Sequence, residues 1–405
     1  MIISDLKVFD VLAVIFIGLS LALFFLVDDS QINTIPTYFL ALLALAAPSL
    51  TSKDYKLQNT LGFKLAICFI AFSVISIVWS SFEDNRKIIS ILGAASTLLG
   101  FIFAGSHLLS KPGVGYGIGF IHFYLLLLVV AILPPVSDFV FREDILWHWV
   151  RLEGNGRLRL ASVAAMCAGL GFVYALVLSI SSKQALTTCG YLALSIFLFL
   201  ALVFTKSRGS LLAVTLCVIL ITYFLSPMKI RVWLSALLLL GVGLFLVMVH
   251  QLYPELWESF LRKGLGLRNF VWRDAVSQWL SGNLVFGAGI LSPFYSEAEY
   301  ERVPGIMDLM VFQHPHSIFL AALVNTGLVG CTLLVAMIAA PLIPLVDIRN
   351  RNRLERCGFF GLVYAGFCLS FDGGSLITKV NELWIVFWCP FLIACFCCPS
   401  SGDRN

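Results

Sequence analysis

The sequence places two histidines, His314 and His316, in the stretch QHPHS at 313–317, directly before a long apolar run. The whole chain has six histidines, so two of them within three residues single out this stretch. Pro315 favours the first turn of a helix, which predicts that both histidines lie at the amino end of that helix. The positive end of the helix dipole would keep an imidazole neutral and attract anions. Such an imidazole could act as a general base at neutral pH, or it could simply cap the helix at the membrane interface.

A second candidate is the stretch TKSRGS at 205–210, which lies between two long apolar runs. The guanidinium of Arg208 can hold a phosphate at two points, and Gly209 lets the backbone approach a ligand. Lys206 supplies a further cation in the same turn. The alternative is that Lys206 and Arg208 extend to lipid headgroups and anchor the helix ends.

A third candidate is the stretch GLGLRNFVWR at 264–273. Apolar residues between Phe270 and Leu280 recur with helical spacing, which predicts an amphipathic helix on the membrane with Arg268 at its amino end. Arg268 and Arg273 could bind a phosphorylated substrate, or they could contact lipid phosphates. No phosphate-binding loop with its Lys-Ser/Thr pair is present in this stretch.

Four carboxylates precede the histidines, at Glu297, Glu299, Glu301 and Asp308. Carboxylates together with imidazole can bind a divalent ion, but the sequence has no compact Asp-x-Asp or His-Glu-x-x-His motif. The alternate spacing of the glutamates also suits an exposed, charge-rich loop. We therefore expect neither a metal site nor a cofactor.

The composition excludes a water-soluble globule. Of the 405 residues, 60% are hydrophobic and 12% are charged, which is about half the charged fraction of a soluble domain. The mean hydropathy of +0.95 also excludes a disordered or fibrous chain. The net charge of +4 is too small to indicate nucleic-acid binding. Most of the eleven cysteines lie in or beside apolar runs, so we interpret them as buried thiols.

The apolar runs predict an all-α, polytopic membrane protein with about twelve helices, forming a single transmembrane domain over residues 1–405. We interpret the first run as a retained helix rather than a signal peptide, because no small-residue cleavage site follows it. Two longer breaks interrupt the runs. The break at 134–158 predicts a segment in the plane of the lipid headgroups, and the break at 251–315 predicts a large loop with short amphipathic helices. The predicted spans are 8–27, 35–50, 61–81, 88–109, 114–133, 159–181, 186–205, 210–226, 232–250, 316–346, 358–376 and 382–398.

Short basic loops predict the orientation, because they remain in the cytoplasm. The densest of them, between the tenth and eleventh spans, contains Arg349, Arg351, Arg353 and Arg356. We therefore expect this loop and both termini in the cytoplasm, with both long breaks and the turn at 205–210 on the other side. Arginines tend to remain on the cytoplasmic side of a membrane protein. The arginines found on the outer side in spite of this tendency suggest that the outer side binds an anionic ligand.

With these three candidate stretches in their order along the chain, the sequence resembles the O-antigen ligase family of multispanning glycosyltransferases. The matching patterns are Ser-Arg-Gly at 207–209, the glycine-rich stretch with Arg268 that ends at Trp272, and HPHSIFLAALVNTGLVG at 314–330. The family usually has Asn where this chain has Ser317. Asp372 resembles an acidic position near the outer end of the penultimate helix.

The resemblance implies a reaction on the periplasmic side of the bacterial inner membrane. A glycan carried by undecaprenyl pyrophosphate would be transferred to a sugar hydroxyl of lipid A–core, with no metal ion. Arg208 and Arg268 would bind the pyrophosphate, and His316 would be the base toward the acceptor hydroxyl. The residues expected to contribute to substrate binding are His314, Lys206, Arg273 and Asp372.

The same sequence features are compatible with other functions. In an O-antigen polymerase the acceptor would be a second lipid-linked glycan, and in a protein O-oligosaccharyltransferase it would be a pilin serine or threonine. A transporter of lipid-linked sugars is the non-enzyme alternative. A transporter is expected to carry ionisable groups or broken helices near the middle of the membrane. In this sequence the candidate groups gather at the ends of the spans, which favours surface chemistry.

Overall fold

The computed structural model describes residues 2–26, 39, 60–81, 85–109, 116–141, 161–225, 267–303, 306–345, 347–378 and 381–396. These residues are mostly helical. The helices before residue 230 are α1 (Ile2–Leu26), α3 (Leu61–Ile75) with the short 3-10 turn η2 (Ser76–Trp79), α4 (Asn85–Leu109), α5 (Tyr116–Phe141), α6 (Ala161–Ser181), α7 (Ala185–Phe204) and α8 (Arg208–Leu225). The later elements are α11 (Arg268–Ser281), β1 (Ser296–Val303), β2 (Ile306–Phe312), α12 (Ile318–Leu342), the 3-10 turns η4 (Ile343–Leu345) and η5 (Ile348–Asn350), α13 (Arg353–Phe371), the π-helical turn η6 (Trp384–Trp388) and α14 (Cys389–Phe396).

Seven helices within the described ranges are long and apolar enough to cross a membrane. Shorter apolar helices at Val11–Phe25, Gly117–Leu133 and Trp384–Cys395 coincide with three further predicted spans. The prediction of a helical, multi-pass membrane protein is therefore confirmed. The predicted spans at 35–50 and 232–250 lie outside the described residues, so the number twelve and the single domain stay predictions.

Helix α6 forms the centre of the bundle, and nearly all of its residues are buried. It packs against α5, α7, α8 and α13. Small residues make this close approach possible. A Cβ atom at Gly169 would lie 2.2 Å from the hydroxyl of Tyr364 on α13, and one at Gly171 would lie 2.5 Å from Leu128 on α5. A larger residue at either crossing would force the facing side chain to move.

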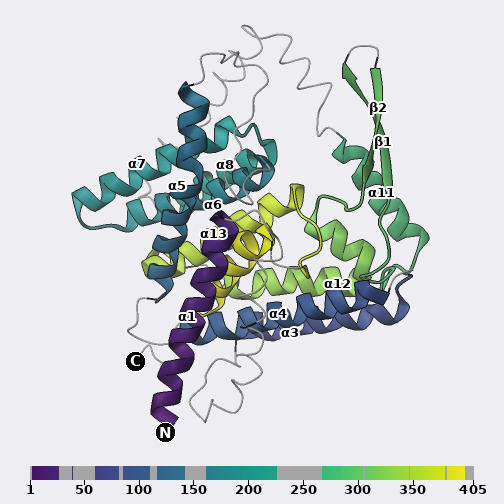
Figure 1. Ribbon diagram of the computed structural model, residues 1–405, viewed down its shortest axis with the longest axis horizontal. Coiled ribbons are helices and arrows are strands. Elements are labelled where there is room, and N and C mark those ends of the chain that lie inside the picture. The colour runs from purple at the N-terminus through teal and green to yellow at the C-terminus, as the bar shows by residue number, and fades with distance from the viewer. Residues whose placement is uncertain are drawn as a thin grey trace.

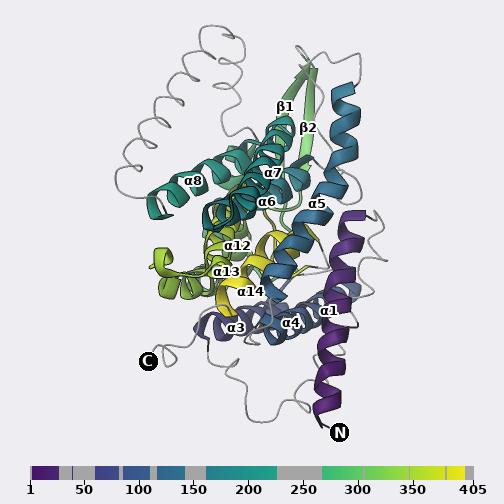
Figure 2. The same cartoon turned by 90° about the vertical axis from the view of Figure 1, so that its left-hand side faces the viewer.

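The helices run in two main directions. Figure 1 shows α3, α4 and α12 lying nearly parallel, whereas α1 and α5 cross them steeply. Turned by 90°, Figure 2 shows α1 and α5 along one side of the molecule, in agreement with the contacts between these two helices. The two strands and α11 project from the opposite end of the bundle to α7 (Figure 1).

Two details differ from the predicted pattern. Helix α5 continues through the prolines at 134 and 135 to Phe141, so the break expected from residue 134 begins later. The remainder of that break, 142–158, lies outside the described residues. The large loop contains an antiparallel hairpin, β1 with β2, as well as the helix α11. The sequence SEAEYERV alternates with the two-residue period of a strand. The interpretation of this alternation as an exposed, charge-rich loop is therefore wrong.

Helix α12 is interrupted at Gly327, whose φ of 63° is left-handed. The loop that follows α11 fills the interruption with its own backbone. The N–H of Leu328 donates to the carbonyl of Leu284 at 3.0 Å, and the N–H of Ala288 donates to the carbonyl of Val324 at 2.8 Å. These hydrogen bonds pair the backbone polar groups that the interruption would otherwise leave without partners, and they hold the loop after α11 against α12.

Candidate active site

Asp372 is the point at which three separate segments meet. It follows directly after the last residue of α13 and forms the carboxyl-terminal cap of that helix. One carboxylate oxygen lies 3.6 Å from Nη2 of Arg268, and the other lies 3.7 Å from Nδ1 of His316. The Asp372 side chain is 14% exposed, while those of Arg268 and His316 are each 28% exposed. A mostly buried carboxylate thus lies between a guanidinium and an imidazole that remain open to a ligand.

Arg268 is the first residue of α11, as the helical spacing predicted. The buried face of α11 contributes Val271 and Ala275 to a small apolar cluster with Phe294 and with Val324 of α12. Because this cluster joins α11 to α12, it fixes the guanidinium relative to the histidines that precede α12. The outward face of α11 also carries exposed apolar side chains, among them Phe270 and Leu280, so its location at the membrane surface stays a prediction.

His316 has an unusual backbone conformation. Its φ of 53° is left-handed, a conformation that costs a residue other than glycine about 1–2 kcal/mol. The helix begins only at Ile318, because the Ser317 side chain accepts a hydrogen bond from the N–H of Leu320 and caps the helix. Both histidines thus lie at the amino end of the helix, but Pro315 is not in its first turn, because residues 314–316 precede the N-cap. The left-handed residue turns the chain so that the His316 ring faces Asp372.

The two histidine rings are in contact. Their centroids lie 4.1 Å apart, and the ring of Phe312 meets His316 edge-on at 5.6 Å. Part of the His314 side chain is exposed, but its neighbours partly desolvate the ring and so lower its pKa. Positive charge on His316 lowers the pKa of His314 further, and the negative Asp372 opposes both effects. His314 is therefore held in its neutral form at neutral pH.

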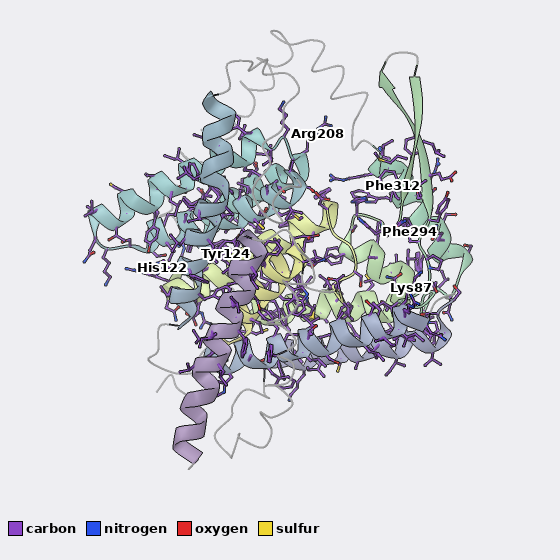
Figure 3. The ribbon with its side chains drawn as sticks, in the orientation of Figure 1. Lys87, His122, Tyr124, Arg208, Phe294 and Phe312 are labelled. Carbon is purple, nitrogen blue, oxygen red and sulfur yellow. The ribbon has the colours of Figure 1, made fainter. Side chains whose placement is uncertain are left out.

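The turn at 205–210 borders this cluster. A Cβ atom at Gly209 would lie 3.2 Å from Cβ of Phe371 and 3.6 Å from Nη1 of Arg268. The start of α8 thus packs directly against the end of α13 and the start of α11. Arg208 and Lys206 flank this contact with exposed side chains, and Figure 3 shows Arg208 at the beginning of α8. Lys206 has a left-handed φ of 56°.

Arg273 is not part of this cluster. Its side chain is 75% exposed, and Nε lies 3.9 Å from the carboxylate of its neighbour Asp274. The guanidinium also lies over the ring of Phe270, 5.5 Å from the centroid. Five residues separate Arg273 from Arg268, which is about 140° around a helix, so the two point in different directions. The expected role of Arg273 in substrate binding finds no support in this geometry.

Trp272 was absent from the predicted site, although the structure places it beside the cluster. Its ring lies 5.9 Å from that of Phe371, the residue before Asp372. The indole N–H is buried and has no hydrogen-bond partner among the described residues. Trp272 follows Arg268 by four residues, so helical spacing places both side chains on the same face of α11. That spacing was the signal in the sequence.

The carboxylates considered as metal ligands lie on the hairpin. Glu297, Glu299 and Glu301 of β1 pair in register with Val311, Leu309 and Met307 of β2, and Asp308 pairs with Tyr300. Within the ranges that the structure describes, no group of three or more His, Cys, Asp or Glu side chains is arranged to hold a metal ion.

Residues 193–335 match the family model described as O-antigen ligase. The resemblance to the O-antigen ligase family is thereby confirmed. No curated protein matches the chain. The region matched by the O-antigen ligase model contains Arg208, Arg268, His314 and His316, whereas Asp372 lies beyond it. The assignment of Asp372 to the site therefore rests on geometry.

The residue type that caps α12 is compatible with the O-antigen ligase pattern. The family usually has Asn at the position of Ser317, and Asn and Ser are about equally good N-cap residues. Since the Ser317 side chain caps the helix in this structure, the exchange preserves the local geometry that precedes α12.

Proposed function

We propose that the protein is an O-antigen ligase, which transfers a polysaccharide from undecaprenyl pyrophosphate to a sugar hydroxyl of lipid A–core at the periplasmic face of the inner membrane. The observation that carries the proposal is the contact of Asp372 with both His316 and Arg268. This contact brings His316, which could take the proton of an acceptor hydroxyl, close to Arg268, which could bind a pyrophosphate. The match of residues 193–335 to the O-antigen ligase model supports the same reaction class.

His316 is the proposed general base. With Asp372 on the Nδ1 side of its ring, the proton is favoured on Nδ1, and Nε2 is left to accept the proton of the acceptor hydroxyl. The carboxylate also stabilises the imidazolium that forms. General-base help of this kind accelerates a reaction by about 10²–10⁴-fold.

The arginines are proposed to stabilise the leaving group. As the acceptor oxygen bonds to the anomeric carbon, the bond from that carbon to the pyrophosphate oxygen breaks, and its electron pair stays on that oxygen. Arg268 and Arg208 would bind the resulting negative charge through charge-assisted hydrogen bonds. The buried indole N–H of Trp272, on the same face of α11 as Arg268, is a further donor beside this position. One displacement inverts the anomeric configuration.

An acceptor assay tests the proposal. The purified protein in lipid nanodiscs receives one undecaprenyl-pyrophosphate-linked glycan and three acceptors in separate reactions: lipid A–core, a second lipid-linked glycan, and a pilin peptide. We expect glycan transfer to lipid A–core, and transfer lowered by about 10²–10⁴-fold in His316→Ala.

The other outcomes contradict the choice of acceptor. Elongation of the second lipid-linked glycan alone identifies a polymerase, and glycosylation of the peptide alone identifies a protein O-oligosaccharyltransferase. If the protein moves the donor across the bilayer without consuming it, the assignment as an enzyme is wrong.

A further inference from the structure

A second polar cluster lies outside the candidate active site. On α5, Nε2 of His122 lies 2.5 Å from the hydroxyl of Tyr191 on α7, and the two rings are stacked with their centroids 5.9 Å apart. Arg353, the first residue of α13, is close enough to interact electrostatically with the Tyr191 hydroxyl. Three helices thus bring one cation and two hydrogen-bonding rings together.

This cluster lies at the other end of the bundle from Asp372. Helix α13 has 19 residues, which corresponds to about 28 Å of length, with Arg353 at one end and Asp372 just beyond the other. The start of α5 lies against the start of α13, since a Cβ atom at Gly117 would lie 2.4 Å from Leu354. Figure 3 shows His122 and Phe312 on opposite sides of the molecule. The separation is close to the thickness of the hydrocarbon layer of a bilayer.

Neighbouring arginines already have structural partners. Arg349 donates from Nε to the carbonyl of Phe224 at 2.6 Å, and Arg356 donates from Nη1 to Ser181 at 3.1 Å. Arg351 pairs with the buried Glu355 at 3.5 Å. Arg349 therefore ties the loop before α13 to α8, Arg351 ties that loop to α13, and Arg356 ties α13 to α6.

Arg353 differs from them. Its side chain is exposed, and it forms no ion pair with an acidic residue of the described ranges. The positive charge at this point is thus left for a ligand.

The rings next to Arg353 supply hydrogen-bond donors. If the Tyr191 hydroxyl donates to Nε2 of His122, the imidazole carries its proton on Nδ1 and can donate it to an anion. A guanidinium can hold two phosphate oxygens at once. Along α7, Leu192, Ile196 and Phe199 are exposed at helical spacing. They form an apolar stripe on the helix face next to that of Tyr191, and this stripe runs toward the other end of the bundle.

We propose that Arg353, His122 and Tyr191 form a binding site for the phosphate group of an anionic phospholipid, whose acyl chains lie along the exposed stripe of α7. The lipid belongs to the leaflet at the Arg353 end of the bundle, opposite the leaflet next to Asp372. Positive charge next to a surface of transmembrane helices favours anionic over zwitterionic headgroups. A free phosphate would use the charged groups but not the apolar stripe.

Lipid retention tests this site. The protein is extracted from vesicles of equal parts phosphatidylglycerol and phosphatidylcholine, and the lipids that remain bound are counted by native mass spectrometry. We expect Arg353→Gln and His122→Phe to lower the retained ratio of phosphatidylglycerol to phosphatidylcholine, by about fivefold for the lost charge. His122→Phe preserves the stacked ring and removes only the polar atoms. Arg353→Lys should keep part of the preference, because it keeps the charge.

The matched control is Lys87→Gln, which removes one exposed positive charge far from His122 (Figure 3). It should retain the wild-type lipid ratio. If Arg353→Gln and His122→Phe retain as much phosphatidylglycerol as this control, the site does not exist. If millimolar inorganic phosphate displaces the retained lipid completely, the site binds free anions, and its assignment to a phospholipid is wrong.

Discussion

Among the individual side chains, Asp372 has the largest consequences for the proposed chemistry. A single carboxylate contacts the proposed base and the proposed pyrophosphate-binding cation. It can therefore orient His316 and Arg268 together before substrate arrives, which lowers the cost of reorganising the site during the reaction. The left-handed backbone of His316 adds strain of about 1–2 kcal/mol, of a kind that is concentrated at functional sites.

Replacement of His316 by alanine should lower glycan transfer by about 10²–10⁴-fold, because the acceptor hydroxyl loses its base. Donor binding should persist, since the arginines remain. Both quantities can be measured with purified donor and acceptor. Arg273→Ala, which changes an exposed residue outside the cluster, should transfer normally. Normal turnover by His316→Ala would remove this residue from the mechanism.

Arg208→Lys should also reduce transfer, by about 10²-fold, because an ammonium cannot reproduce the two-point contact with a phosphate. The measurement is the initial rate of glycan transfer at saturating donor. Arg273→Lys provides the same chemical change away from the cluster and should leave the rate unaltered. Full activity of the Arg208→Lys variant would assign Arg208 to anchoring in the headgroup layer.

The lowered pKa of His314 makes stability depend on pH. The folded protein binds a proton at His314 less readily than the unfolded chain, so stability falls as the pH falls through about 6.5 and below. The thermal midpoint should thus decrease between about pH 7.5 and pH 5.5, and His314→Asn should reduce that decrease. An equal decrease in wild type and variant would show that other groups cause it.

Helix α12 combines a membrane span with an interruption that has a structural role. Gly327 occupies a left-handed conformation, and a Cβ atom there would lie 2.3 Å from the carbonyl oxygen of Val285. The loop before β1 can pair with α12 only because this space is empty. Since the loop connects α11 with the hairpin, the interruption helps to hold Arg268 near His316.

Gly327→Ala should therefore destabilise the protein by about 1–3 kcal/mol and reduce transfer as well. Gly366→Ala is a suitable control, because a Cβ atom at this helical position of α13 has no neighbour within 4 Å. That control should be neutral or slightly stabilising. Unfolding in detergent, followed by circular dichroism, measures both variants. Equal stability of the two variants would show that the loop tolerates a Cβ atom.

The molecule as a whole has two chemically different ends. One end carries the cluster around Asp372, and the other carries the arginine-rich start of α13. Helix α7 connects them, with Lys183 just before its first residue and Lys206 just after its last. Its 20 residues correspond to about 30 Å, enough to cross the hydrocarbon layer.

Labelling from outside the inner membrane tests the proposed orientation. In a background without cysteine, Lys206→Cys should react with a membrane-impermeant maleimide applied from the periplasm, and Lys183→Cys should react only after the membrane is permeabilised. The reverse pattern would place the candidate active site in the cytoplasm and contradict the proposed reaction.

The sequence by itself determined the helical membrane class and most of the candidate residues. Apolar runs long enough to span a bilayer can satisfy their backbone polar groups only as helices, so composition and run length decide that class. The arginines at 208 and 268 could be placed at helix starts because the local pattern changes there from polar to apolar. His314 and His316 were identified by their proximity in the chain.

Only the tertiary structure decided which candidates meet. Asp372 joins His316 and Arg268, Arg273 points elsewhere, and the His122–Tyr191 pair lies at the other end of the bundle. Such contacts depend on side-chain direction and on packing between segments distant in the chain, which a local pattern does not encode. The break in α12 has the same origin, since Gly327 becomes necessary only when another segment's backbone packs against it.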